Sequence, residues 1–509
     1  MSRRLTPRNS PHYLPGWAVS VVPVAVAALL TLPMLSRSPL WADEIDSVSA
    51  ANRRLQQLGL LLRHQDGPLA AYYVLLHGWI WAFGSSAWVV RLPSALALLA
   101  AIALIAETGR RLAGRWTGLL GGLLLAVNPF VLGFGLDARP YAFAVLASAG
   151  CALVLVNAGL QPRRGARVAY AAWLVLGGLA HLFFLLLVPA HLLAIRLRRW
   201  PVRPWLAPAA LGVTLLCPLL ALSAGQTFEV GYLRRPGLDS LPGWWQAMSG
   251  GEPWLAVPAA LLAIVGVRQR WAQLHPILMT WLLLPGPVLL VVSFLQPLYL
   301  NRYVVESAPA LALWMATVLV GACASVRLGR TALTTGAIFL ASSLMTSLVT
   351  QLAPFRYEDP RAASDEVLDH AGRGDGLVML PTGVRTVMSY YLRRVDPHSA
   401  QPVDLLQAPP GNEDAHGDFG GVMLVPAAAE AALLRYRVVW LVRYADPSAD
   451  RGTTAAAVEA DLARCFQGGS TQHFGLLEVR RETATGRCPP EGDGVRASRG
   501  DQIAPVRLR

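Results

Sequence analysis

Charged side chains are scarce in this chain of 509 residues. Asp, Glu, Lys and Arg make up 15% of it, against roughly 25% in soluble domains, which argues against an ordinary cytosolic enzyme. The signatures of nucleotide binding are also missing: there is no G-x-G-x-x-G after a predicted strand and no Walker loop. Only five cysteines are present, and no tight spacing of His and Cys predicts a structural zinc site.

Apolar residues dominate instead, at 54% of the chain. About 20 residues are needed to cross the hydrocarbon core of a bilayer as a helix. Uncharged runs of about that length or longer lie at 17–36, 116–136, 140–162, 168–195, 204–228, 276–301 and 331–355. The sequence therefore predicts an α-helical polytopic membrane protein.

The net charge of +13 is unevenly distributed. Residues 1–354 hold 26 basic and 10 acidic residues, and residues 355–509 hold 18 basic and 21 acidic ones. A basic surplus in short loops between apolar runs is the signal that keeps such loops in the cytoplasm. We therefore expect the basic residues to lie next to membrane lipids, and we expect no nucleic-acid partner.

The basic clusters fix an expected topology of about eleven spans. We place in the cytoplasm "RRLTPR" (3–8), "GRRLAGR" (109–115), "PRRGAR" (162–167), "RLRRWPVR" (196–203), "RQR" (268–270) and "RLGR" (327–330). Between the third and fourth clusters only two short helices fit, turning near His181. The aromatic-rich stretch 67–84 is expected at the outer interface. Residues 1–16 are then a cytoplasmic N-terminus, with the first apolar run a retained anchor, not a cleaved signal.

The remaining boundaries follow from this topology. Residues 17–354 form the membrane domain, with an outer loop at 36–86, and residues 355–509 form a small extracytoplasmic α/β domain of alternating strand-like and helix-like stretches. In an oxidising outer compartment Cys465 and Cys488 could form a disulfide. Cys151, Cys217 and Cys323 lie in apolar runs and are expected to be packing residues.

Nearly all the acidic residues before position 355 face outward in this topology. Asp43 and Glu44 in "LWADE" stand at the outer edge of the first span, and Asp137 lies in the short outer loop "GLDARPY". An ionisable group at this depth is costly unless it has a function. Such carboxylates could act as a general base or hold a divalent metal ion, in which case Asp43 and Asp137 are the candidates. The alternative is that they are simply solvated loop residues.

Several stretches together resemble the GT-C glycosyltransferases, specifically the bacterial protein-mannosyltransferase-like group. They are "WADEIDS", "HQDGPLAAYYVLLHGWIWAFGSSAWVVRLPSAL" and "RRLAGRWTGLLGGLLLAVNPFVLGFGLDARPYAF", followed by "PLYLNRYVVESAPALAL" (297–313) and the start of the tail at 355–381. The resemblance covers residues 15–200 best, and it depends on the order and spacing of these stretches. It implies inverting transfer of a sugar, such as mannose or arabinose, from a polyprenyl-phosphate donor to a lipid, protein or wall polysaccharide. The acceptor would be at the outer face of the cytoplasmic membrane.

The resemblance also implies roles for residues. Asp43 would be the general base, supported by Glu44, and Asp137 would orient the acceptor or a metal ion. Arg139 would be a phosphate partner or a local tether. His64 and Asp66 fall in "HQDGP", where the chain departs from its relatives: His64 is separated from Pro68 by an inserted "QDG", whereas relatives have His directly before paired prolines.

The chemistry of the donor points to further residues. A lipid phosphate leaving group needs a cation at the interface, and the guanidinium fork matches phosphate oxygens. Arg302 in "LNRYVV", with Tyr303 beside it, is the best candidate, although a snorkelling interface arginine would look the same. Glu306, one helical turn later, is expected to pair with Arg302. His181 in "AHLFF" is either part of the site or a buried core histidine.

Three other classes of protein fit some of these features. A transporter or flippase of polyprenyl-linked intermediates would also use outer arginines and broken helices, although no paired inverted repeats are evident. A polymerase or ligase of longer glycans is a second alternative. A non-catalytic scaffold is the third, and it would not require Asp43, Asp137 and Arg302 to converge.

Overall fold

The computed structural model describes residues 15–226, 233, 235–268, 275–322, 326–355, 357–392, 402–408, 419–421, 423–445 and 453–488. The chain divides into two compact units, one made of Met1–Arg356 with Asp414–Phe419, and one of Tyr357–Glu413 with Gly420–Arg509. The first unit is helical and the second is built around a sheet. This confirms the predicted fold class. The predicted cytoplasmic N-terminus falls almost wholly outside the described residues.

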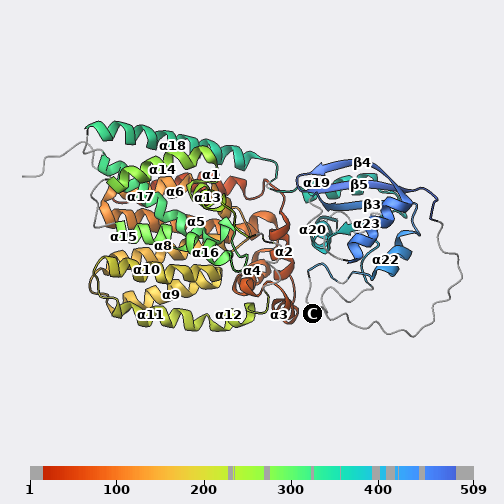
Figure 1. Ribbon diagram of the computed structural model, residues 1–509, viewed down its shortest axis with the longest axis horizontal. Helices are drawn as coiled ribbons and strands as arrows, with labels where there is room; N and C mark the ends of the chain where they lie inside the picture. Colours follow the sequence, from red (N-terminus) through yellow and green to blue (C-terminus); the bar gives the residue numbers. More distant parts are fainter. Residues whose placement is uncertain are drawn as a thin grey trace, which may run out of the picture. The chain divides into compact units, whose positions relative to one another are not determined.

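The helical unit contains helices whose long members run side by side (Figure 1). In chain order they are α1 (Ala18–Thr31), η1 (Leu32–Met34), α2 (Ala42–Ala51), α3 (Leu55–His64), η2 (Gly67–Leu69), α4 (Ala70–Phe83), α5 (Ala87–Ala113), α6 (Arg115–Ala126), α7 (Pro129–Gly135), α8 (Tyr141–Ala158), α9 (Arg164–Ala180), η3 (Leu182–Leu186), α10 (Leu187–Leu197), α11 (Arg203–Leu215), α12 (Cys217–Ser223), α13 (Ser240–Ser249), α14 (Pro253–Arg268), α15 (His275–Leu283), α16 (Pro285–Ser293), η5 (Asn301–Ser307), α17 (Ala308–Ala322) and α18 (Val326–Leu352).

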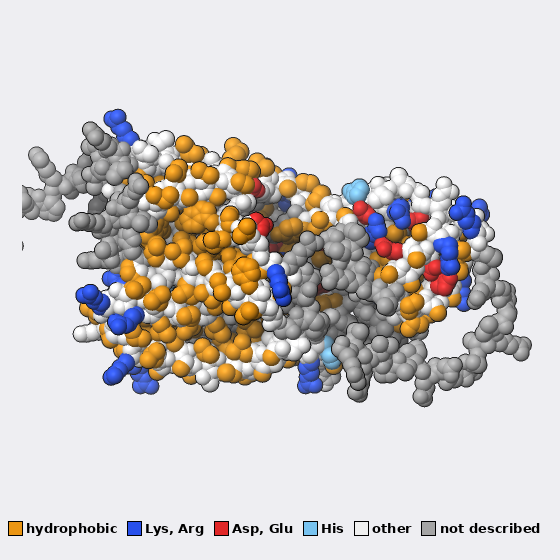
Figure 2. Space-filling view, viewed as in Figure 1, with side chains coloured by type: hydrophobic (Ala, Val, Ile, Leu, Met, Phe, Trp, Pro, Cys, Tyr) orange, Lys and Arg blue, Asp and Glu red, His pale blue; other side chains and the backbone are white. Residues whose placement is uncertain are grey.

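Many of these helices are suited to a membrane. In the described part of the chain, five are long and apolar enough to cross it, and three bent helix pairs raise the number to eight if each pair is one span. Two shorter apolar helices, Ala18–Met34 and Leu182–Leu197, add to them. Figure 2 shows apolar side chains spread over the visible face of this unit, with basic side chains toward its ends. The chain is therefore a multi-pass membrane protein.

One break in these helices lies where the sequence predicted a turn, near His181, and another interrupts the uncharged run 116–136, which was predicted as one span. α9 ends at Ala180, His181 is extended at φ −157°, and the chain re-enters through η3 and α10. α6 and α7 meet at 70°, where Asn128 accepts a hydrogen bond from the Val131 N–H and caps α7. The short helices predicted around His181 are thus present.

The outer loop predicted at 36–86 folds into short helices. α2, α3 and α4 gather at one end of the bundle (Figure 1). After α12, Gln226 reaches the same end: its side chain accepts from the Gly67 N–H at 2.6 Å and donates to the Leu62 carbonyl at 2.8 Å. The end of α12 is therefore at the same end of the bundle as α3 and η2.

The second unit is a mixed five-stranded sheet with the order β2-β1-β3-β5-β4. β1 is parallel to β2 and β3, and β5 is antiparallel to β3 and β4. One face packs on α19 and α20, and the other on α22 and α23. The elements are α19 (Pro360–His370), β1 (Gly376–Leu380), α20 (Thr382–Leu392), β2 (Val403–Asp404), α22 (Pro426–Leu433), β3 (Val438–Tyr444), α23 (Thr453–Cys465), β4 (Phe466–Phe474) and β5 (Leu477–Ala484).

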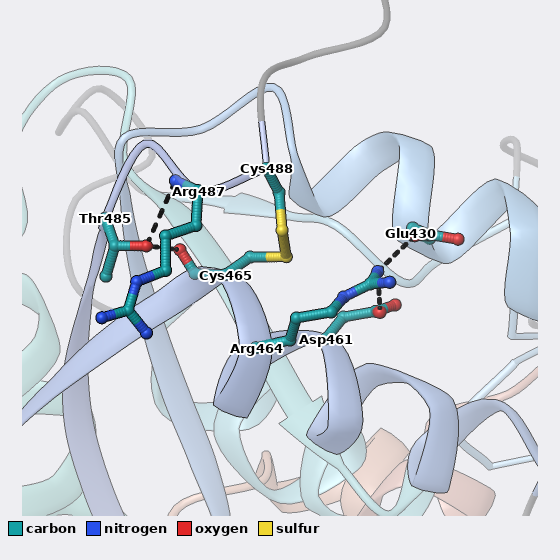
Figure 3. Close-up of a disulfide and its surroundings, with 7 residues drawn as sticks. All are labelled: Glu430, Asp461, Arg464, Cys465, Thr485, Arg487 and Cys488. Atoms are coloured by element: carbon teal, nitrogen blue, oxygen red, sulfur yellow. Dashed lines mark hydrogen bonds and ion pairs between the residues drawn. A yellow bond between two sulfur atoms is a disulfide. The ribbon is translucent and has the colours of Figure 1, made fainter.

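Cys465 and Cys488 are joined by a disulfide in this unit, with their Cα atoms 5.4 Å apart. It ties the end of α23 to the segment after β5 (Figure 3). Beside it the Thr485 hydroxyl donates to the Cys465 carbonyl at 2.9 Å, and Arg464 contacts Glu430 and Asp461, each at 2.7 Å. The bond therefore fixes the chain after the last strand to the sheet's helical cover.

Candidate active site

The first turn of α2 carries the two carboxylates that the sequence singled out. Trp41 is extended and precedes the helix, so Asp43 and Glu44 both fall in its first turn. Negative charge is favoured there because the free backbone N–H groups give the helix start a partial positive charge. Local sequence thus explains where the two side chains are placed, and tertiary contacts explain why their burial and their partners differ.

Glu44 is fully buried and bound on all sides. The Arg91 guanidinium of α5 donates to both of its oxygens, at 2.7 and 2.6 Å, and the Ala138 N–H donates to it at 2.8 Å. The same guanidinium donates to the carbonyls of Leu35, Ser38 and Pro39 at 2.9–3.0 Å. Glu44 and Arg91 therefore join the end of the first helix, α5 and the turn before α8, and no face of this carboxylate is open to a substrate.

Asp43 is different because its side chain is 23% exposed. Arg302 donates to its Oδ2 from Nη1 at 3.0 Å, and the Arg139 Nη2 is 3.8 Å from the same oxygen. Three residues that are far apart in the sequence thus meet at one carboxylate. The arrangement is one anion facing two cations, partly open to its surroundings.

Arg139 is held by contacts of its own. Its Nη1 donates to the Asp43 carbonyl at 3.2 Å, the Ser47 hydroxyl at 3.3 Å and the Tyr73 hydroxyl at 3.4 Å. The Ser94 hydroxyl of α5 donates to its backbone carbonyl at 2.9 Å. Its Nε has no hydrogen-bond partner among the described residues. The guanidinium is therefore fixed in place and keeps one free donor.

Aromatic rings surround Arg302. Its guanidinium lies 5.9 Å from the ring of Tyr141 and 5.8 Å from that of Tyr303, which is within the range of cation–π attraction. The His181 ring packs at 4.8 Å from Tyr303, 5.8 Å from Tyr141 and 5.5 Å from Phe183. The Nε of Arg302 and Nδ1 of His181 are buried and have no partner in the described part of the chain. The predicted residues Arg302, Tyr303 and His181 thus form one wall next to Asp43.

Glu306 does not pair with Arg302, so that prediction was wrong. Residues Asn301–Ser307 form a 3₁₀ segment that is interrupted at Val304 (φ −129°). Side chains four apart no longer share one face in such a segment. Glu306 is buried, and its Oε1 has no hydrogen-bond partner among the described residues.

Asp66 and His64 take different positions. The Tyr73 hydroxyl donates to Asp66 Oδ2 at 2.5 Å, so Asp66 connects through Tyr73 to Arg139. Burial raises the pKa of Asp66 above its ordinary value, and the positive charge of Arg139 offsets part of that rise. His64 is exposed, and its Nδ1 contacts the Leu60 carbonyl of its own helix at 2.9 Å and no other polar atom of the described residues. The contacts of the site therefore include Asp66 and leave out His64.

Asp137 is buried, and its Oδ1 accepts a hydrogen bond from the Trp41 indole at 3.3 Å. Trp41 is the residue before α2, so this contact helps to fix the start of the helix that carries Asp43. As for the predicted metal ligands, no group of three or more His, Cys, Asp or Glu side chains that could hold a metal ion occurs among the described residues. Asp43 faces two arginines instead, and a carboxylate paired with two cations does not fit the role of a metal ligand.

Arg91 and Tyr73 were not singled out from the sequence. Arg91 did carry a usable signal, because it is a lone charge in the apolar first half of α5, and an ionisable group in such a segment is expected to have a partner. Tyr73 lies in an aromatic-rich stretch that gives no sign of which ring faces inward. Only the fold shows that its hydroxyl links Asp66 to Arg139.

Comparisons with known proteins agree with this description. Residues 66–222 match a family model described as dolichyl-phosphate-mannose-protein mannosyltransferase. No curated protein matches the chain.

Solved structures resemble the fold over most of its length. The crystal structure of ArnT from Cupriavidus metallidurans in the apo state matches with a TM-score of 0.58 at 14% identity, covering 92% of this chain and 98% of that one. The same protein bound to undecaprenyl phosphate matches with a TM-score of 0.57 at 14% identity, covering 94% and 99%. The archaeal oligosaccharyltransferase AglB from Archaeoglobus fulgidus, in complex with an inhibitory peptide and a dolichol-phosphate, matches with a TM-score of 0.50 at 11% identity, covering 89% and 72%.

Proposed function

We propose that the chain is a membrane glycosyltransferase of the GT-C type, which transfers a sugar from a polyprenyl-phosphate donor to an acceptor hydroxyl, with inversion. The observation that carries the proposal is the partly exposed carboxylate of Asp43 next to the guanidinium groups of Arg302 and Arg139. It is supported by the lipid phosphates bound to ArnT and AglB and by the mannosyltransferase family model. The acceptor is a lipid, a protein or a wall polysaccharide at the outer face of the cytoplasmic membrane.

Asp43 is the general base in this proposal. It takes the proton of the acceptor hydroxyl while the acceptor oxygen forms a bond to the anomeric carbon. The bond from that carbon to the phosphate oxygen breaks, and its electron pair leaves with the lipid phosphate. A single displacement of this kind inverts the anomeric carbon, and a positioned base typically contributes a factor of about 10² to 10⁴ in rate.

The two arginines bind the phosphate. In the structure Arg302 is paired with Asp43, and a base paired with a cation is a poor base. A donor phosphate offers Arg302 a second anion, so donor binding draws part of the guanidinium away from Asp43 and leaves that carboxylate freer to accept a proton. The unpartnered Nε groups of Arg302 and Arg139 supply donors for the extra oxygens.

The neighbouring residues position these groups. Glu44 with Arg91, and Asp137 with Trp41, fix the start of α2 and therefore the direction of Asp43. His181 and Tyr303 line the side of the site where the sugar would lie, and the free Nδ1 of His181 can bond to a sugar hydroxyl. Asp66 acts through Tyr73 on Arg139.

The test is sugar transfer by the purified chain in lipid, from a panel of radiolabelled polyprenyl-phosphate sugars to a membrane acceptor extract. Asp43→Asn should lower turnover by about 10²-fold or more with little change in the unfolding midpoint. Asp239→Asn, which changes an exposed carboxylate, is the matched control and should leave turnover unchanged. Full turnover in Asp43→Asn would exclude Asp43 as the base.

The transporter alternative makes a different prediction in the same preparation. A flippase would move the labelled lipid across the bilayer of a vesicle without releasing the sugar from its phosphate. Translocation without transfer, for every donor in the panel, would therefore replace the transferase proposal with the transporter one.

A further inference from the structure

A groove of about 660 Å³ runs along the surface of the helical unit between α9 and α11. Its lining is apolar except for Arg164 and Arg167. Ala171 and Pro208 are buried beneath it, while the small, exposed Ala172 and Ala207 line it without filling it. The groove thus presents an apolar channel with two cations.

The two helices are held close together on their inner side, which keeps the groove in shape. A Cβ added to Gly212 of α11 would be 3.0 Å from the Leu174 Cβ of α9. A Cβ added to Gly178 would be 2.1 Å from a methyl carbon of Leu216. The two glycines therefore let α9 and α11 approach closely on the inner side of the groove.

The groove is long enough for a lipid chain. It is lined from Arg164 to Leu179 along α9, which at a rise of 1.5 Å per residue is roughly 22 Å. One leaflet of the hydrocarbon core is roughly 15 Å thick. An acyl chain that starts at the arginines can therefore lie in the groove through its whole leaflet.

No described residue neutralises Arg164 or Arg167. The sequence holds no Asp or Glu between Asp137 and Glu229, so α9, α10 and α11 can supply no carboxylate. Arg164 and Arg167 make no ion pair with any described residue, and the buried Nε of Arg167 has no hydrogen-bond partner among them. Both lie in the first turn of α9, where the helix dipole already favours an anion.

We propose that this groove binds one anionic diacyl phospholipid, with its phosphate at Arg164 and Arg167 and one acyl chain along α9 and α11. Basic pockets between membrane helices are known binding places for anionic head groups. By the distribution of basic loops, this end of α9 faces the cytoplasmic leaflet. α11 leads away from it to α12 and Gln226, which lies at the end where Leu62 and Gly67 are found. The lipid site is therefore separate from the site at Asp43.

The experiment measures lipid adducts on the full-length chain by native mass spectrometry. Phosphatidylglycerol and phosphatidylcholine with the same acyl chains are titrated onto delipidated wild type, Arg164→Gln/Arg167→Gln and Ala207→Trp. The matched control is Arg163→Gln, which changes the exposed neighbour that does not line the groove. Thermal unfolding of each variant checks its fold, and Arg164→Ala/Arg167→Ala replaces the Gln pair if that variant unfolds early.

Wild type and Arg163→Gln should bind one phosphatidylglycerol at least ten-fold more tightly than phosphatidylcholine, because the choline ammonium of the zwitterionic lipid offsets the phosphate charge that the two arginines contact. The double variant should lose that preference, and Ala207→Trp should lose the adduct because the indole fills the channel. Equal affinity for the two lipids, or a preference that survives in the double variant, would overturn the proposal. So would displacement of the lipid by inorganic phosphate at equal concentration, or a ten-fold preference for polyprenyl phosphate. None of these readouts depends on sugar transfer.

Discussion

Asp43 and Glu44 are adjacent in the sequence, yet they belong to two different ion-pair clusters. Glu44 and Arg91 form a closed cluster in which side-chain exposures are 0% and 3%. Asp43, Arg139 and Arg302 form an open cluster in which Asp43 and Arg302 are 23% and 24% exposed. The closed cluster has its donors and acceptors matched, whereas in the open one the Nε atoms of both arginines have no partner among the described residues.

This difference separates a structural role from a chemical one. A buried ion pair with all its hydrogen bonds made resists any change, because breaking it leaves an uncompensated charge. A partly exposed pair with spare donors can exchange one partner for a ligand at a smaller cost. We infer that the closed cluster fixes the start of α2 so that the open cluster can change partners.

The largest effect is expected when the closed cluster is broken. Arg91→Met removes the cation and leaves the buried Glu44 carboxylate without its main partner, which should cost about 3–5 kcal/mol of unfolding free energy. Denaturant unfolding in mild detergent measures it. Arg111→Met on the same helix breaks an exposed pair with Glu107 and should cost less than about 1 kcal/mol.

The double variant Glu44→Gln/Arg91→Met sharpens this prediction. It removes both charges, so it should be more stable than Arg91→Met alone. An Arg91→Met variant as stable as wild type would show that the closed cluster does not support the fold.

A smaller effect on stability, but a clear one on activity, is expected at the open cluster. Arg302→Ala should lower kcat/KM for the donor by about 10²-fold, as for removal of one donor to a developing anion. Arg302→Lys keeps the charge without the fork and should recover part of the loss. Arg37→Ala, an exposed arginine of the loop before α2, is the control. Equal activity of Arg302→Ala and wild type would remove Arg302 from the site.

The smallest effect is expected at Asp66, at the edge of the open cluster. Burial raises its pKa above the ordinary value of 3.8, so the folded chain holds this proton more tightly than the unfolded chain. Stability contributed by the protonated form is then lost as pH rises from about 4 through the raised pKa. The Asp66→Asn variant has no titrating group at this position, so it cannot lose this stability. Its stability relative to wild type should therefore increase with pH over that window, and parallel stability curves would contradict this.

The sequence predicted one cluster and missed the other, for a physical reason. Asp43 was found because a charge near an apolar run needs an explanation, Arg302 because a phosphate leaving group needs a cation, and Arg139 from the resemblance to the GT-C group. Arg91 is also a charge in an apolar run, but the sequence analysis assigned Glu44 to the support of Asp43 and not to a partner of its own. The partner of a buried charge is set by tertiary packing, here 47 residues away, and no local pattern contains that information.

The same limit applies to smaller elements. The strands β1, β3 and β5 coincide with apolar stretches of the predicted α/β domain, whereas the sequence does not mark β4, because "FQGGSTQHF" is almost wholly exposed and shows no apolar alternation. The expected pairing of Glu306 with Arg302 failed because Val304 interrupts the helix there. Prediction failed in both places because the local backbone geometry depends on contacts with distant residues.

The contact between Asp43 and Arg302 joins residues 259 positions apart. At roughly 5–20 residues per second of synthesis, the carboxylate leaves the ribosome some tens of seconds before its cation. A chain that is only partly translated and inserted therefore holds the proposed base without the proposed phosphate-binding arginine. The proposed transfer becomes possible only after nearly all the membrane helices have been made, so we expect a truncated product to be inactive in the membrane.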